Sequence, residues 1–306
     1  MKIGFIYAGQ GSQKVGMGQS FYENDNEAKQ LFDNYPDLRK LCFLGPIEEL
    51  SKTCNTQPCM VLFAIVVTKL LKKNGIEPDY VAGLSLGEYS ALNAAGVFDD
   101  ETVIDVVRLR GKAMSEAVAG IESQMAAIMN LDRRTLKAIC LQASDAGVVD
   151  IANYNCPEQL VIAGEKKAVE KAKILARAVG AKRIIPLNTS GPFHTKLLEP
   201  ASNTLKEKFK TVEFHEMKVP VVFNTTANIL LENQSVADML EKQVKSPVYF
   251  EDSIRYMIDQ GVDVFIEIGP GKVLSGFVRK IDKTKKIYQV EDKASLEKVI
   301  HELQGE

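Results

Sequence analysis

Apolar residues in this chain form short runs typical of buried strands and longer segments typical of helices. Four runs with strand character end at or near glycine-containing or turn-forming loops, at 2–9, 79–83, 219–227 and 262–268. Helices are predicted between them at 57–74, 86–95, 99–120, 195–210 and 235–243. This alternation predicts an α/β fold in which helices pack on a mostly parallel sheet.

The order of predicted elements changes between residues 123 and 189. It becomes β-α-β-β-α-β, with predicted strands at 124–131, 148–155, 159–164 and 182–188 and helices at 132–144 and 166–179. That order is the ferredoxin-like arrangement, which can form a small unit of its own. We therefore expect a discontinuous large domain, residues 1–122 and 190–306, with a ferredoxin-like domain inserted at 123–189.

Composition and charge exclude several classes of protein. The 306 residues carry a net charge of -2 with a pI near 6.1, which gives no general reason to bind nucleic acid or an anionic membrane. Five cysteines without a C-x-x-C pair, and no signal-peptide pattern, predict a reduced cytoplasmic protein without disulfides or zinc. The most apolar stretch, residues 59–71, is short for a membrane span.

A serine flanked by glycines follows the predicted strand at 79–83. In GLSLG, Gly83 and Gly87 permit a tight strand-to-helix turn around Ser85, and the first N–H groups of the next helix point toward its hydroxyl. This geometry suits a nucleophile beside an oxyanion site. The same short pattern also describes a helix N-cap between two turn glycines, and alone it does not separate the two.

Two further residues suit chemistry beside a serine. His194, in SGPFHTK, lies in a turn-forming stretch of low charge, and imidazole is the usual base for a serine, although a lone histidine is more often structural. Arg110 projects from the apolar face of the helix predicted at 99–120, where a guanidinium requires an anion. That anion is either a protein carboxylate, the commoner case, or the carboxylate of a substrate.

The loop GQGSQ, residues 9–13, follows the first predicted strand. Its glycines let the backbone approach another group closely, and Gln10 offers a main-chain N–H and a side-chain amide. The loop lacks both the G-x-G-x-x-G spacing and the Lys-Ser/Thr ending of phosphate-binding loops. Nucleotide binding is therefore disfavoured.

These blocks together resemble the malonyl-CoA:acyl carrier protein transacylases of fatty-acid synthesis and the related acyltransferase domains of polyketide synthases. The likeness runs from end to end, through GQGSQ (9–13), GLSLGEYSAL (83–92), RLRGKAM (108–114), NYNCPEQLVIAG (153–164), GPFHT (191–195), NTTA (224–227), QVKSPVYF (243–250) and EIGPGKVL (267–274). The resemblance implies a hydrolase-like α/β domain with an inserted ferredoxin-like subdomain.

The resemblance also implies a mechanism and a role for each site residue. Malonyl would pass from malonyl-CoA to the phosphopantetheine thiol of acyl carrier protein through a malonyl-serine ester, without a metal or other cofactor. The implied roles are Ser85 as nucleophile, His194 as its base oriented by a main-chain carbonyl, the N–H groups of Leu86 and Gln10 as oxyanion hole, Arg110 as partner of the malonyl carboxylate, Gln243 as a residue that shapes the site, and Phe193 as a block to branched acyl groups.

The chain departs from the family pattern at two positions. Leu84 precedes the nucleophile where many relatives have histidine, and Ala8 stands where many have proline. We expect Leu84 to have modest effects on rate or on contacts with CoA, because it leaves Ser85 and His194 unchanged.

The implied carrier protein is acidic, so its docking surface should be basic. The densest cationic run, residues 279–286, makes Lys283, Lys285 and Lys286 the expected contacts of a monomeric enzyme, although such a run is also typical of a solvated helix end.

The alternatives to malonyl transfer in fatty-acid synthesis are a discrete acyltransferase serving a polyketide synthase, a serine acyl-hydrolase such as an editing thioesterase, and a scaffold without activity. A buried arginine beside the serine favours malonyl transfer over hydrolysis of neutral acyl groups, and the intact set of site residues disfavours a scaffold.

Overall fold

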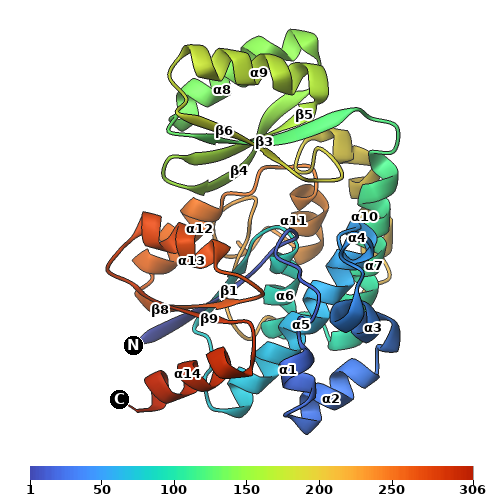
Figure 1. Ribbon diagram of the computed structural model, residues 1–306, viewed down its shortest axis with the longest axis vertical. Coiled ribbons are helices and arrows are strands. Elements are labelled where there is room, and N and C mark those ends of the chain that lie inside the picture. The colour runs from blue at the N-terminus through green and yellow to red at the C-terminus, as the bar shows by residue number, and fades with distance from the viewer. Residues whose placement is uncertain (306) are drawn as a thin grey trace.

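The computed structural model describes residues 1–305 and contains two separate β-sheets (Figure 1). The larger sheet has the order β7-β2-β1-β8-β9, and each neighbouring pair is parallel. Its strands are β1 (Lys2–Tyr7), β2 (Tyr80–Gly83), β7 (Val221–Val222), β8 (Val262–Ile268) and β9 (Lys286–Val290). The predicted mostly parallel sheet is confirmed, and the carboxyl ends of its strands meet at one edge, where α/β proteins place their ligands.

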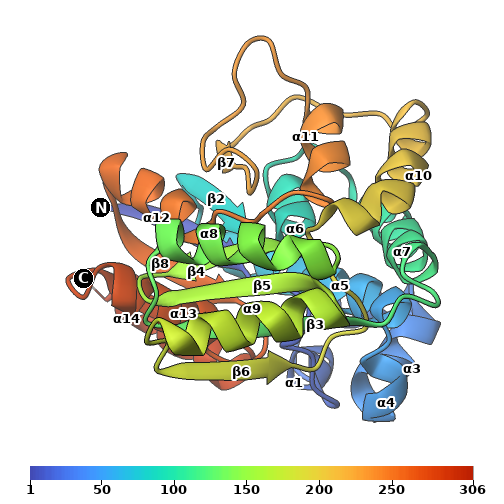
Figure 2. The same ribbon diagram turned by 90° about the horizontal axis from the view of Figure 1, so that it is seen from above.

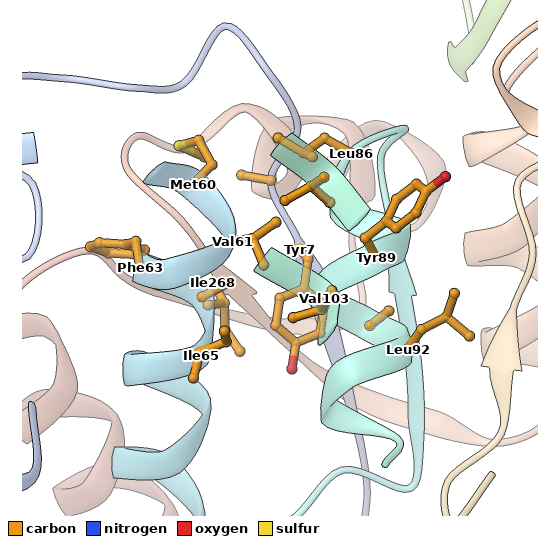
Figure 3. Close-up of a cluster of buried hydrophobic side chains, with 14 of the residues drawn as sticks. Tyr7, Met60, Val61, Phe63, Ile65, Leu86, Tyr89, Leu92, Val103 and Ile268 are labelled. Carbon is orange, nitrogen blue, oxygen red and sulfur yellow. The ribbon is translucent and has the colours of Figure 1, made fainter. Parts of the chain in front are cut away.

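Helices cover both faces of this sheet because side chains along each strand alternate between the faces. Phe5 and Tyr7 of β1 point into one apolar cluster with α5 (Thr53–Lys73), α6 (Gly87–Ala94) and α7 (Asp100–Ala117). Figure 3 shows Tyr7 between side chains of α5 and α6. Ile6 points into the opposite cluster, with α12 (Phe250–Asp259) and α13 (Val273–Ile281).

The remaining helices of the larger unit surround this arrangement. They are α1 (Gln19–Tyr22), α2 (Asn26–Asp33), α3 (Pro36–Leu44), α4 (Ile47–Leu50), α10 (Glu199–Phe209), α11 (Val236–Gln243) and α14 (Lys293–Gln304), with a 3-10 turn at Lys196–Leu198. Of the first four, α2, α3 and α4 contact α5, and α2 lies beside the carboxyl end of α5, where Asp25 pairs with Lys73 (Figure 1).

The second sheet is antiparallel, with the order β4-β5-β3-β6. Its elements are β3 (Ser123–Met129), α8 (Arg133–Ala143), a 3-10 turn (Ser144–Ala146), β4 (Val149–Cys156), β5 (Gln159–Glu165), α9 (Lys166–Ala178) and β6 (Arg183–Leu187). Figure 2 shows α8 and α9 side by side over one face of the sheet. Side chains on its other face, such as Met125 and Val161, belong to the apolar core of the larger unit. This face of the small sheet therefore packs toward the parallel sheet.

Two sets of contacts fix the small sheet to the larger unit. The Tyr154 N–H donates to the Val248 carbonyl at 2.8 Å and the Val248 N–H donates to the Ala152 carbonyl at 2.9 Å, which continues the edge of β4. Arg133 at the start of α8 pairs with Asp252 and Glu251 of α12 at 2.7 and 3.0 Å. The segment before α12 therefore contacts both units.

Several element bounds differ from the predictions. Helix α5 begins at Thr53 rather than residue 57, because polar residues of its first turn are buried against neighbouring helices. Of the strand predicted at 219–227, only Val221–Val222 pair with β2. By length and composition α5 is the one helix in residues 1–305 that could cross a membrane, but 83% of its apolar window is buried, as expected of a core helix.

Candidate active site

Ser85 lies in the turn between β2 and α6, at the carboxyl edge of the parallel sheet. Its backbone is left-handed, with φ 53°, a strained conformation for any residue except glycine. A Cβ at Gly83 would lie 1.9 Å from the carbonyl carbon of Gly87, and a Cβ at Gly87 would lie 2.1 Å from the carbonyl oxygen of Tyr7. Glycine is therefore required on both sides of Ser85. The serine hydroxyl does not cap α6, whose N-cap residue is Leu86.

His194 lies directly beside this serine. Its Nε2 is 2.7 Å from the Ser85 hydroxyl, and its Nδ1 is 3.0 and 3.1 Å from the carbonyl oxygens of Gln243 and Ser246. A proton on Nδ1 that is donated to these carbonyls leaves Nε2 as the acceptor for the serine proton. Burial and, second, the charge of Arg110 lower the pKa of His194 to about 4. The imidazole is therefore neutral at pH 7 and free to accept a proton.

Arg110 is buried on α7 and reaches the same hydroxyl. Its guanidinium donates to Gln57 Oε1 at 2.9 Å, to Gln243 Oε1 at 3.0 Å and to Ser85 Oγ at 3.2 Å. No carboxylate of residues 1–305 lies within ion-pair distance of the Arg110 guanidinium. The structure therefore does not contain the ion pair between Arg110 and a protein carboxylate that the sequence left open. Burial raises the pKa of the neighbouring Glu88 to about 8, which leaves that carboxyl largely protonated at pH 7. The positive charge of Arg110 is therefore not balanced by an ionised partner.

Gln243, the last residue of α11, connects these three residues. Its side-chain Nε2 donates to the Ser85 carbonyl at 2.7 Å, while its Oε1 accepts from Arg110 and its main-chain carbonyl accepts from His194. The side chain is completely buried. Gln243 thus fixes the nucleophile turn, the cation and the imidazole relative to one another.

Two residues that line this site have backbone N–H groups without a partner in the described chain. Among the described residues, the N–H groups of Leu86 and Gln10 have no hydrogen-bond acceptor, and both residues line the cavity above Ser85. The Gln10 side chain is held by Thr53 Oγ1 at 3.0 Å, and that oxygen lies 2.6 Å from the Ser190 hydroxyl. A pair of fixed, unpaired N–H groups beside a serine can stabilise an oxyanion.

A cavity of about 480 Å³ opens onto Ser85 between the two sheets. Its apolar lining comes from α7, from the face of the small sheet that joins the main core, and from Phe193, which is 7% exposed. Asn153 and Asn155 of β4 add two amides. Such a cavity fits a short acyl group and the arm that carries it better than a large apolar ligand.

Sequence reasoning missed three polar residues of this site. Gln57, Glu88 and Asn224 are each at most 1% exposed and contact Arg110 or the Ser85 turn. Asn224 begins the NTTA block and Glu88 lies in the GLSLGEYSAL block, but neither residue was singled out within its block, and Gln57 lies outside the quoted blocks. Within residues 1–305, no cluster of three or more His, Cys, Asp or Glu side chains could hold a metal ion.

The structure shows what Ala8 and Leu84, the two departures from the family pattern, contact. The Ala8 N–H donates to the Ile268 carbonyl at 3.0 Å, a hydrogen bond that proline could not make. Leu84 lines the cavity, and its carbonyl oxygen would lie 2.5 Å from a Cβ at Gly9. Neither residue contacts His194 through a hydrogen bond in the described chain.

The lysines expected to dock a carrier protein lie away from the cavity. Lys286 pairs with Val264 near the amino ends of the strands, whereas Ser85 follows the carboxyl end of β2. Four residues along β9 separate Lys286 from the carboxyl edge, about 13 Å at ~3.3 Å per residue. Lys285 forms an ion pair with Asp263. Charge density alone did not indicate which edge of the sheet these lysines occupy, and docking at Lys283, Lys285 and Lys286 stays a prediction that their position does not favour.

Comparisons with known proteins show which family this chain belongs to. A family model described as acyl transferase domain matches residues 4–305. The malonyl CoA-acyl carrier protein transacylase of Bacillus subtilis is 45% identical over 100% of this chain and 98% of its own length. The structure of the Clostridium perfringens transacylase of the same name superposes with a TM-score of 0.96 at 41% identity, covering 100% of this chain and 98% of that one. A malonyl-transacylase in complex with a type II PKS acyl-carrier protein has a TM-score of 0.95 at 36% identity, covering 99% of this chain and 100% of that one.

Proposed function

The chain belongs to the acyl transferase family, among the malonyl CoA-acyl carrier protein transacylases, and from this we infer that it transfers a malonyl group from malonyl-CoA to acyl carrier protein. The reaction exchanges one thioester for another, without a change in oxidation state. We propose that it proceeds in the cytoplasm, in fatty-acid synthesis, without a metal or redox cofactor.

One observation carries this proposal: a buried arginine without an ionised partner lies 3.2 Å from the hydroxyl of a serine-histidine pair. A carboxylate at the far end of a short acyl group would satisfy the guanidinium while the thioester carbonyl meets Ser85. Malonyl has that carboxylate, and acetyl and longer alkyl chains do not. Hydrolysis of neutral acyl thioesters provides no use for Arg110.

The first half-reaction forms an ester on Ser85. His194 accepts the serine proton at Nε2 while Oγ attacks the thioester carbon, and the N–H groups of Leu86 and Gln10 bind the oxyanion. Collapse breaks the carbon–sulfur bond, and the His194 proton passes to the departing CoA thiolate. In the second half-reaction a carrier-protein thiol gives its proton to His194, attacks the malonyl ester and takes the malonyl group, and Oγ regains the proton.

The acyl end of the cavity accounts for selectivity. Phe193 lines the cavity one residue before the base, where its ring would compete for space with an α-methyl branch on malonyl. We propose that this side chain limits the enzyme to the unbranched malonyl group.

We propose that the carrier protein approaches the carboxyl edge of the parallel sheet, where the cavity opens. The relative solved with a type II PKS acyl-carrier protein supports this class of partner and keeps a polyketide carrier as the second candidate. The two carriers would use the same chemistry at Ser85.

The test is the mass of the enzyme after incubation with malonyl-CoA or acetyl-CoA, for wild type and Ser85→Ala. We expect a malonyl adduct on the wild type, little acetyl adduct and none on the variant. Equal acetyl and malonyl adducts, or a malonyl adduct that survives Ser85→Ala, would contradict the proposal.

A further inference from the structure

The Asn224 side chain forms hydrogen bonds with the main chain of the turn that holds Ser85. Its Oδ1 accepts from the Ser85 N–H at 2.8 Å, and its Nδ2 donates to the Gly83 carbonyl at 2.7 Å. The residue follows β7 and is 1% exposed. One amide therefore holds the main chain on both sides of the strained, left-handed position.

Glu88 holds Asn224 in turn. The Asn224 N–H donates to Glu88 Oε2, while Oε1 of this completely buried carboxyl has no hydrogen-bond partner in residues 1–305. Glu88 lies in the first turn of α6, three residues after Ser85. The contacts thus form a closed ring from the serine turn to Asn224 and back through α6.

The same asparagine also joins the segment that orients the base. Its carbonyl accepts from the Tyr249 N–H at 2.9 Å, three residues after Ser246, whose carbonyl faces Nδ1 of His194. Asn224 is therefore bonded to the nucleophile turn through its side chain and to the segment behind the histidine through its main chain.

We propose that Asn224, held by Glu88, is a positioning residue that fixes the Ser85 turn so that the hydroxyl faces His194. The proposal rests on the nucleophile role of Ser85. By accepting the Ser85 N–H, Asn224 also withholds that donor from the oxyanion site and leaves the Leu86 N–H to face it. The hydrogen bonds require an acceptor and a donor on one side chain at position 224, but only an acceptor at position 88.

These requirements predict a pattern among variants. Asn224→Ala removes both side-chain hydrogen bonds, and Asn224→Asp keeps the acceptor but sets a carboxylate against the Gly83 carbonyl. Glu88→Gln keeps an acceptor for the Asn224 N–H and should retain most of the wild-type rate, whereas Glu88→Ala should not. Thr225→Ala is the matched control, because it changes the next residue, whose hydroxyl has no partner in the described chain.

The experiment measures the rate of Ser85 modification by malonyl-CoA and by a small neutral sulfonyl fluoride, per folded enzyme, together with the melting temperature. A misplaced nucleophile loses about 100-fold in rate, so we expect both Asn224 variants to lose on this order with both reagents. In Asn224→Ala the pH midpoint of the rate should not move, because this variant changes no charged group. The Thr225→Ala enzyme should react like wild type.

Three outcomes would overturn the proposal. If both Asn224 variants react at the wild-type rate per folded enzyme, Asn224 contributes to stability only and does not position Ser85. Loss with malonyl-CoA alone would make Asn224 a substrate contact, and a shifted pH midpoint in Asn224→Ala would mean that the residue acts on His194. The sulfonyl fluoride needs no malonyl site, so it tests the proposal even if malonyl transfer itself proves wrong.

Discussion

Arg110→Ala should lower malonyl transfer far more than acetyl transfer. The guanidinium is buried, lies 3.2 Å from the nucleophile and has only amide and hydroxyl oxygens as hydrogen-bond acceptors in the described chain. If the malonyl carboxylate completes its set of partners, the variant leaves that carboxylate in the cavity without a cation. Acetyl has no carboxylate and loses nothing of this kind.

The magnitude follows from the burial of the site. Removing one partner of a buried, hydrogen-bonded charge pair costs about 2–5 kcal/mol, and each ~1.4 kcal/mol is a factor of ten. We therefore expect kcat/KM for malonyl-CoA to fall on the order of 100-fold or more. The variant also leaves the oxygens of Gln57 and Gln243 unpaired, at about 1–3 kcal/mol each, but this affects both substrates. The ratio of malonyl to acetyl transfer isolates the carboxylate.

The assay is kcat/KM with each thioester, and Arg108→Ala is the control. Arg108 lies two residues away on α7, is partly exposed and pairs with Asp37 at 2.7 Å, so its removal should leave both rates unchanged. An equal loss for malonyl and acetyl in Arg110→Ala would show that the arginine only supports the structure and does not bind the malonyl carboxylate.

Three further predictions follow from the site and its surroundings. Activity requires neutral His194, so the acid limb of kcat/KM should have its midpoint near pH 4, where burial and then Arg110 place the pKa; a midpoint near 6.5 would be inconsistent with the buried pair. Phe193→Ala should raise the use of an α-methyl-branched malonyl thioester relative to malonyl-CoA by about tenfold, and an unchanged ratio would remove Phe193 from selectivity. Replacing Lys283, Lys285 and Lys286 by alanine should leave KM for the carrier protein unchanged, and a raised KM would restore the docking surface expected from charge.

The fold was predictable where the apolar pattern was long or regular. Strands β1 and β8, the core helix α5 and the whole β-α-β-β-α-β order have that pattern, and the structure contains them. The four helices between Gln19 and Leu50 were not predicted, because none exceeds nine residues and each buries only one or two side chains. Their positions depend on packing against α5.

The site was predictable where local sequence determines geometry. The glycines around Ser85 are required by the close approach of backbones, and Arg110 stands out on an apolar helix face. Glu88 and Asn224 carried no comparable signal, because a polar residue early in a helix or in a loop is ordinary until tertiary contacts bury it. Their partners lie more than 130 residues apart in sequence.

We expect Ser85 to pass its malonyl group to a carrier-protein thiol rather than to water. The most direct measurement is to isolate the malonyl-enzyme, add carrier protein with or without its phosphopantetheine arm, and follow the masses of both proteins. We predict that the malonyl mass moves from the enzyme to the carrier with the arm and stays on the enzyme with the carrier that lacks it. Release of free malonate while both carriers stay unmodified would contradict the account and make the enzyme a hydrolase.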